Sequence, residues 1–286
     1  NVVGANSSSI TLREGASLAA PEVFLVSSTG EIVMEQGASI NTLGRGKASY
    51  DARDGFVYQV ANMLAVSNGL LNVVNALQAG GAASGGINLG ACNSAPCSGQ
   101  TALYSEGSIV ALTDKTLQMG DEVRYGTRHL NLGLASINVG SPEALAAAAA
   151  GNRLPAGMTL TQLVLDRLLR GDTQFGAPHL ETLQLSARDS FNFYGSSALD
   201  TYDAVTGKSL LSRLMLSAPA IYGAGSASDV ASIHTANLIW LGAETPAVAA
   251  IDGGAGSGNG RLDIQAERIE FGYGDFAQPS TTKRFD

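Results

Sequence analysis

Two nearly identical stretches near the amino end of the chain constrain its fold more than any other feature. Residues 10–18 read ITLREGASL and residues 32–40 read IVMEQGASI, an offset of 22 at every position. In each copy apolar residues alternate and then meet a Gly-Ala-Ser corner, which is the pattern of a strand rather than a helix. A fixed period of this length is typical of solenoids, whose repeats bury their apolar faces only by stacking. The sequence therefore predicts an all-β dominated fold, a right-handed parallel β-helix.

Strand patterns return in the second half of the chain. A Leu-x-Leu/Ile-x-Ala phrase occupies residues 183–187, 214–218 and 262–266, and the spacing of residues 236–242 is repeated at 266–272. Small inward alanines at corners, with leucine and isoleucine beside them, suit a narrow solenoid interior. We therefore expect further rungs here.

Helix signals interrupt the strands in the middle of the chain. Ser141, Pro142 and Glu143 provide an N-cap, a first helical residue and an acid in the first turn, and the helix should end at Gly151. A second helix is expected over residues 159–170, before Gly171. Earlier, the Asn68-Gly69 turn favours strands over the alternative of a helical face in residues 56–77.

These patterns predict one continuous solenoid with two insertions. Rungs occupy residues 1–140 with a loop insertion at 79–100, a helical insertion follows at 141–176, and rungs continue over 177–286. Residues 79–86 contain only glycine, alanine and serine, so we expect an exposed loop there. The chain begins without a signal peptide and neither end resembles a capping repeat, so we expect a fragment of a longer protein.

Composition excludes several classes of partner. Charged residues make up 15% of the chain and the net charge is −8, which argues against binding nucleic acid or anionic lipid surfaces. No stretch approaches the roughly 20 apolar residues of a membrane-spanning helix.

The two cysteines, Cys92 and Cys97, frame four residues that include a proline. We predict a small-loop disulfide and hence an oxidising compartment, with a pair of free thiols as the alternative. Two cysteines without nearby histidines are too few for a zinc site.

A set of short phrases, in a fixed order, resembles the downstream conserved region of the filamentous-haemagglutinin family of large bacterial exoproteins. The resemblance covers roughly residues 103–274. The phrases stand at residues 107–109 (GSI), 124–126 (RYG), 136–140 (SINVG), 154–157 (LPAG), 176–183 (GAPHLETL) and 190–195 (SFNFYG).

The resemblance implies a secreted β-helical stalk on the bacterial cell surface, exported by a partner outer-membrane pore in two-partner secretion. Members of the family serve as adhesins, as biofilm components or as stalks for contact-dependent toxins. No catalytic residue and no cofactor is carried over from the family to this chain.

Catalysis is the main alternative, because some β-helices cleave polysaccharides with acids and bases gathered on one sheet. Three groups of charged residues come closest to such a cluster, and we expect each to be solvated loop charge. They are Asp51, Arg53 and Asp54; Asp121, Glu122 and Arg124; and Asp200 and Asp203 on either side of Tyr202.

Other candidate residues have simpler structural interpretations. His129, His179 and His234 are far apart in sequence, so we predict neither a metal site nor a catalytic triad. The glycine-rich residues 253–260 lack the acids of a calcium-binding repeat and predict a tight loop. Trp240 is expected to pack in the core or on the flank of the solenoid rather than to form a sugar platform, and Tyr194 and Tyr222 are expected to stack as a ladder.

The sequence as a whole predicts a structural and adhesive segment of a surface exoprotein, not an enzyme. Its expected partners are the secretion pore and a receptor or glycan on a host or neighbouring cell. A polysaccharide-cleaving enzyme, a toxin-delivery stalk and a self-associating filament remain as alternatives.

Overall fold

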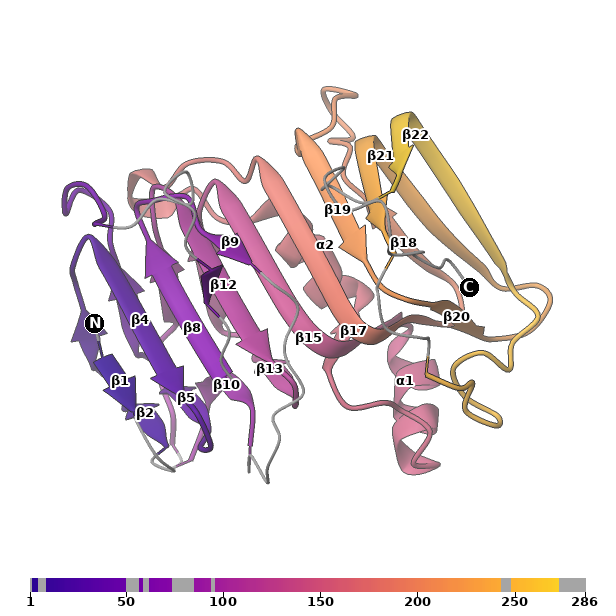
Figure 1. Ribbon diagram of the computed structural model, residues 1–286, viewed down its shortest axis with the longest axis horizontal. Helices are drawn as coiled ribbons and strands as arrows, with labels where there is room; N and C mark the ends of the chain where they lie inside the picture. Colours follow the sequence, from indigo (N-terminus) through magenta and orange to yellow (C-terminus); the bar gives the residue numbers. More distant parts are fainter. Residues whose placement is uncertain are drawn as a thin grey trace. The chain divides into compact units, whose positions relative to one another are not determined.

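The computed structural model describes residues 2–4, 9–49, 57–58, 62–73, 85–93, 96–242 and 248–272 (Figure 1). It is mostly strand, and most strand pairs are parallel, as in β-solenoids. The chain divides into two compact units. Unit 1 comprises residues 1–134 and 171–180, and unit 2 comprises residues 135–170 and 181–286.

The strands of unit 1 form three stacks that the chain visits in turn. The first and third stacks are parts of one 16-stranded sheet, and the second is a separate four-stranded sheet. The first stack contains β2 (Ile10–Leu12), β5 (Ile32–Glu35), β10 (Ile87–Ala91) and β13 (Leu117–Met119). The second contains β3 (Ser17–Leu18), β6 (Ser39–Asn41), β11 (Thr101–Tyr104) and β14 (Val123–Gly126). The third contains β1 (Val2–Gly4), β4 (Glu22–Ser27), β8 (Asn62–Ser67), β12 (Ser108–Thr113) and the start of β15 (His129–Gly140). The short strands β7 (Val57–Tyr58) and β9 (Asn72–Val73) pair only with each other among the described residues.

The 22-residue repeat is one circuit through these stacks. Ile10 lies beside Ile32 and Ser17 beside Ser39, so residues one repeat apart are direct neighbours in parallel strands. The same offset recurs where Thr101 pairs with Val123. Each repeat thus covers the apolar face of the one before it, and the predicted stacking is confirmed.

β8 departs from the expected parallel arrangement. It lies between β4 and β12 and runs antiparallel to both, with Leu64 opposite Leu25 on one side and Ala111 on the other (Figure 1). All six of its residues are buried. Reversing a strand keeps the two-residue alternation of its side chains, so β8 still presents matching apolar faces to its neighbours.

The loop insertion predicted at 79–100 contains a strand. Residues 87–91 form β10, which pairs with β5 and β13, and its buried side chains alternate as a strand requires. Residues 79–84 lie outside the described residues. Cys92 and Cys97 follow β10 and are joined by a disulfide, with 5.7 Å between their Cα atoms.

Small hydroxyl side chains line the corner that follows the second stack of unit 1. Thr42, Ser105 and Thr127 come directly after β6, β11 and β14 and are at most 1% exposed. Ser105 and Thr127 share a hydrogen bond of 2.7 Å, and Thr127 donates to the carbonyl of Gly107 at 2.9 Å. Stacked hydroxyls satisfy one another, so the buried corner carries no unpaired polar group at these residues.

Unit 2 contains the predicted helix α1 (Pro142–Ala150), which follows the end of β15. Ser141 accepts a hydrogen bond from the amide of Ala144 at 3.2 Å, as an N-cap should, and the cap at the other end is Gly151. α1 packs through Leu145 and Ala148 against Tyr194.

The second helix is shorter than predicted. Residues 158–161 form a strand, β16 (Met158–Thr161), and α2 begins only afterwards (Gln162–Arg170). Met158 and Leu160 are buried while Thr159 is exposed, so this segment alternates and pairs with β15 from Ile137 onward. Strand pairing with β15 decides the structure of this segment, because intrinsic helix propensity is a weak preference that tertiary contacts override.

The remaining strands of unit 2 also stack in parallel. They are β17 (Thr182–Tyr194), β18 (Ser197–Asp200), β19 (Arg213–Ser217), β20 (Ile221–Ala224), β21 (Val230–Leu241) and β22 (Arg261–Phe271). Leu183 pairs with Leu214, as the first two Leu-x-Leu phrases predict. Leu262 instead pairs with Ala231, because the third phrase lies on another side of the stack.

Two predicted registers in unit 2 are wrong by one or two residues. Ile269 pairs with Leu238 rather than Ile239, because Leu238 and Trp240 are the inward residues of β21. Tyr194 pairs with Ala224, two residues beyond Tyr222, so the tyrosines do not form the expected ladder. Both tyrosines instead contribute to the cluster around α1.

Candidate functional site

The acidic groups singled out in the sequence do not form a catalytic cluster among the described residues. Asp51, Arg53 and Asp54 lie outside those residues. Arg124 donates to the backbone carbonyl of Asp121 at 2.9 Å and to that of Val123 at 3.1 Å. These two hydrogen bonds hold the backbone at the corner that leads into β14.

The three histidines, for which the sequence predicts no metal site, lie on different elements. His129 lies on β15 and His234 on β21, while His179 follows the short 3-10 helix η2 (Gln174–Gly176). Within the described ranges no group of three or more histidine, cysteine or acidic side chains is arranged to hold a metal ion. The glycine-rich residues 253–260 form a tight turn, in which the amides of Gly256 and Gly258 both donate to the carbonyl of Gly223.

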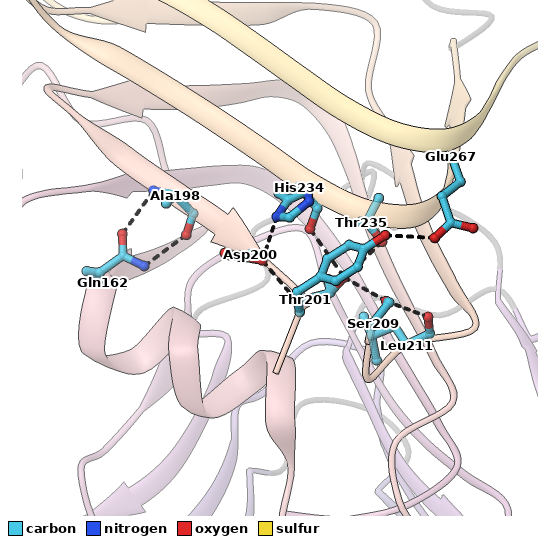
Figure 2. Close-up of polar contacts among 10 residues, drawn as sticks. Gln162, Ala198, Asp200, Thr201, Ser209, Leu211, His234, Thr235 and Glu267 are labelled. Atoms are coloured by element: carbon cyan, nitrogen blue, oxygen red, sulfur yellow. Dashed lines mark hydrogen bonds and ion pairs between the residues drawn. The ribbon is translucent and has the colours of Figure 1, made fainter. Parts of the chain in front are cut away.

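One polar cluster does form in unit 2, and it contains Asp200, which Figure 2 labels, and Tyr202. Asp200 and His234 are register partners on β18 and β21, with 3.1 Å between the aspartate Oδ1 and the imidazole Nδ1. The ring of Tyr202 stacks on the imidazole at 4.1 Å, and its hydroxyl donates to Glu267 at 3.0 Å. We call these four residues the Tyr202 cluster.

Hydrogen bonds from buried residues support the Tyr202 cluster (Figure 2). Thr201 donates to Thr235 at 3.0 Å beneath it, and both threonines are at most 1% exposed. From α2, Gln162 makes two hydrogen bonds to the backbone of Ala198. Partial burial and then the bond to Glu267 raise the pKa of Tyr202, so its hydroxyl is a donor and not a base. The cluster ties successive strands together and presents no activated nucleophile.

A tight loop projects beside this cluster. Asp203 accepts hydrogen bonds from the amides of Val205 and Thr206, at 3.1 and 2.7 Å, and these fix the turn. The hydrogen bonds from Thr206 lower the pKa of Asp203. Val205 stands at the tip with 93% of its surface exposed. The loop is thus ordered by its own backbone and displays an apolar tip.

A cavity of about 390 Å³ opens in unit 2, and sequence reasoning missed it. Its wall contains Phe193 of β17, Trp240 of β21 and Phe271 of β22, with 6.0 Å between the ring centroids of Trp240 and Phe271. In the neighbouring strand Phe193 pairs with Gly223, whose missing side chain leaves the space. A Cβ atom built on Gly223 would meet nothing within 4 Å. We call this space the aromatic pocket.

Two charged side chains line the aromatic pocket. The carboxylate of Asp229 accepts hydrogen bonds from the amide and hydroxyl of Ser226, at 2.7 and 2.9 Å, and from the hydroxyl of Ser196 at 3.2 Å. The backbone bond from Ser226 is the largest cause that lowers the pKa of Asp229, so the carboxylate is charged at neutral pH. Arg261 pairs with Asp263, with 2.7 Å between Nε and Oδ1.

Trp240 and Tyr222 are pocket residues that the sequence did single out, Trp240 for its own packing. Trp240 is 8% exposed and faces inward, as predicted for a core residue, yet it also forms part of the pocket wall. The signal for the pocket itself is the pairing of Phe193 with Gly223, which becomes visible only when the register between β17 and β20 is known.

The described part of the chain contains no helix long and apolar enough to cross a membrane. In comparisons with known proteins, no protein-family model, no curated protein and no solved structure matches this chain.

Proposed function

We propose that this chain is a non-catalytic structural and adhesive segment of a large secreted bacterial surface exoprotein of the filamentous-haemagglutinin type, folded as a right-handed parallel β-helix. The observation that carries the proposal is the match between the 22-residue repeat and the register of the strands. Ile10 beside Ile32 and Ser17 beside Ser39 make each repeat one rung of a stack. A stack of this kind extends by adding rungs and needs no cofactor to do so.

The physical role proposed is to hold loops at fixed positions along a stiff support. Parallel strands about 4.8 Å apart are joined by backbone hydrogen bonds, so neighbouring rungs resist shear. The loop tipped by Val205 is a feature suited to display, since it is ordered at its base by Asp203 and exposed at its end. The net charge of −8 favours solubility outside the cell.

The family and the export route rest on the ordered sequence phrases alone. The expected partners are an outer-membrane secretion pore and a receptor or glycan on an opposing cell. The disulfide between Cys92 and Cys97 is compatible with an oxidising compartment outside the cytoplasm.

Adhesion is tested by coating beads with the chain and counting those retained on epithelial cells and on Gram-negative bacterial cells. We expect at least a severalfold excess over beads coated with an acidic protein of similar size. Beads coated with the heat-unfolded chain are the matched control, because they carry the same composition and charge.

Retention no greater than on the control beads, on both kinds of cell, would contradict the adhesive role. In parallel, the chain is incubated with polygalacturonate and alginate, and new reducing or unsaturated ends are measured. Formation of such ends would replace the proposal with that of a polysaccharide-cleaving enzyme.

A further inference from the structure

We propose that the aromatic pocket binds one neutral pyranose ring of a carbohydrate. The proposal deepens the adhesive function above, on which its biological meaning rests, by naming the class of ligand. Three features of the pocket support the proposal: its aromatic side chains, its glycines and its two charged groups.

The aromatic wall supplies an apolar surface of the kind that covers a sugar ring. Trp240 and Phe271 are register partners on adjacent strands, so their rings lie next to each other, with an angle of 33° between their planes. Phe271 is 63% exposed, which is unusual for a large apolar side chain and leaves its surface open to a ligand. Aromatic rings contact the C–H groups on one face of a pyranose without needing a hydrogen bond.

Part of the lining is backbone, because four glycines contribute to it: Gly195, Gly223, Gly225 and Gly260. Gly223 matters most, since any larger residue in register with Phe193 would occupy the cavity. The residue itself is exposed, so the space is reached from solvent. Ordinary cores leave few voids larger than a water molecule, whereas small-molecule sites range from about 300 to 1,000 Å³. The cavity of about 390 Å³ falls within the second class.

The charged groups restrict the ligand to a neutral polar one. Both charges already have partners, because Asp229 accepts hydrogen bonds from Ser226 and Ser196 and Arg261 is paired with Asp263, so neither stands alone to select an ion of opposite charge. A wholly apolar ligand would displace water from these polar groups without offering hydrogen bonds of its own, at a considerable cost. A pyranose satisfies both requirements, because its hydroxyls donate to a carboxylate and accept from a guanidinium while its ring face covers the aromatic wall.

The chain contains a built-in reporter for this binding, since Trp240 is its only tryptophan. Fluorescence of the full chain is titrated with the methyl pyranosides of glucose, galactose and mannose and with N-acetylglucosamine, and saturation-transfer NMR identifies the protons in contact. We expect at least one of these sugars to change the emission saturably, with a Kd on the order of 1 mM. Glucuronate and glucosamine, which carry charge, should bind more weakly than neutral glucose.

Two variants locate the binding. Gly223→Leu should abolish the fluorescence change by filling the cavity, and Phe271→Leu should weaken binding at least fivefold. Phe175→Leu is the matched control, because Phe175 is 74% exposed and is not among the residues that line the pocket. It should leave the Kd unchanged, and circular dichroism verifies that each variant is folded.

Two results would overturn the pocket proposal: no saturable response to any of the four sugars, or an unchanged Kd in Gly223→Leu. The bead assay separates this proposal from the adhesive function. Bead retention that persists in Gly223→Leu would contradict the pocket proposal alone. Sugar binding without bead retention would contradict the adhesive role alone.

Discussion

Gly86→Ala is expected to destabilise the chain by more than about 4 kcal/mol, the range reserved for severe steric or burial defects. A Cβ atom at this position would lie 2.0 Å from the carbonyl oxygen of Thr116 in the next rung. That oxygen already accepts a hydrogen bond from the amide of Ile87, so it cannot move away without breaking the pairing of β10 with β13. Thermal unfolding followed by circular dichroism should show Tm lowered by roughly 10 °C or more.

Gly223→Ala is the matched control for this prediction. Neither glycine has a positive φ, so the two substitutions differ only in the space around the new methyl group. Because nothing lies within 4 Å of it, alanine at 223 should change the stability by less than about 1 kcal/mol. Equal losses in the two variants would mean that rungs do not approach each other at Gly86 as described.

Asn62→Ala should cost about 3 kcal/mol, since it removes hydrogen bonds and leaves buried groups without partners. The Asn62 amide donates to the carbonyl of Gly30 at 2.7 Å, and its oxygen accepts from the hydroxyl of Thr113 at 2.6 Å. Asn62 is fully buried and is the first residue of β8. It therefore satisfies the backbone at the point where the antiparallel strand enters the stack.

Urea unfolding measures this loss, and Asn237→Ala is the control. Asn237 likewise donates from its amide to a backbone carbonyl, that of Ser212 at 2.9 Å, but in an exposed position where water can replace it. We expect that control to lose less than about 1 kcal/mol. In the double variant with Thr113→Val, part of the Asn62→Ala cost should be recovered. Strictly additive losses would show that the two side chains do not interact.

Local patterns predicted those parts of the fold that depend on neighbouring residues. The alternating apolar residues and the corners at Gly15 and Gly37 predicted the correct period of 22 residues. They did so because residues one repeat apart in the sequence are the residues that pair in neighbouring strands. The helix start at Ser141 was also correct, since capping depends on residues within one turn.

Features that depend on distant pairing were not predictable from the sequence. The pattern of β8 is the same read in either direction, so its antiparallel course is decided by the space between β4 and β12. Met158 and Leu160 fit a helix as well as a strand, and pairing with β15 decides between them. The one-residue error at Leu238 has the same origin, because only the facing strand reveals which residue points inward.

The candidate site likewise has some residues that the sequence singles out and some contacts that only the strand register reveals. Asp200, Tyr202 and Trp240 were singled out from their residue types, but their partners His234, Glu267 and Phe271 follow from the register of β18, β21 and β22. The Tyr202 cluster therefore acts as a link between strands, which the residue types alone do not indicate. The aromatic pocket exists because Gly223 faces Phe193, a contact between residues 30 positions apart.

A pair of engineered cysteines tests the central claim that one 22-residue repeat is one rung of a parallel stack. Ser17 and Ser39 are register partners on β3 and β6, and their hydroxyls lie 3.0 Å apart. The variant S17C/S39C should form a disulfide on mild oxidation, detected by mass spectrometry of the digested chain, and should gain about 3 kcal/mol of stability. The control S17C/N41C is displaced by two residues along β6, beyond the reach of a disulfide, and should remain reduced. A disulfide that forms in the control and fails to form in S17C/S39C would contradict the account.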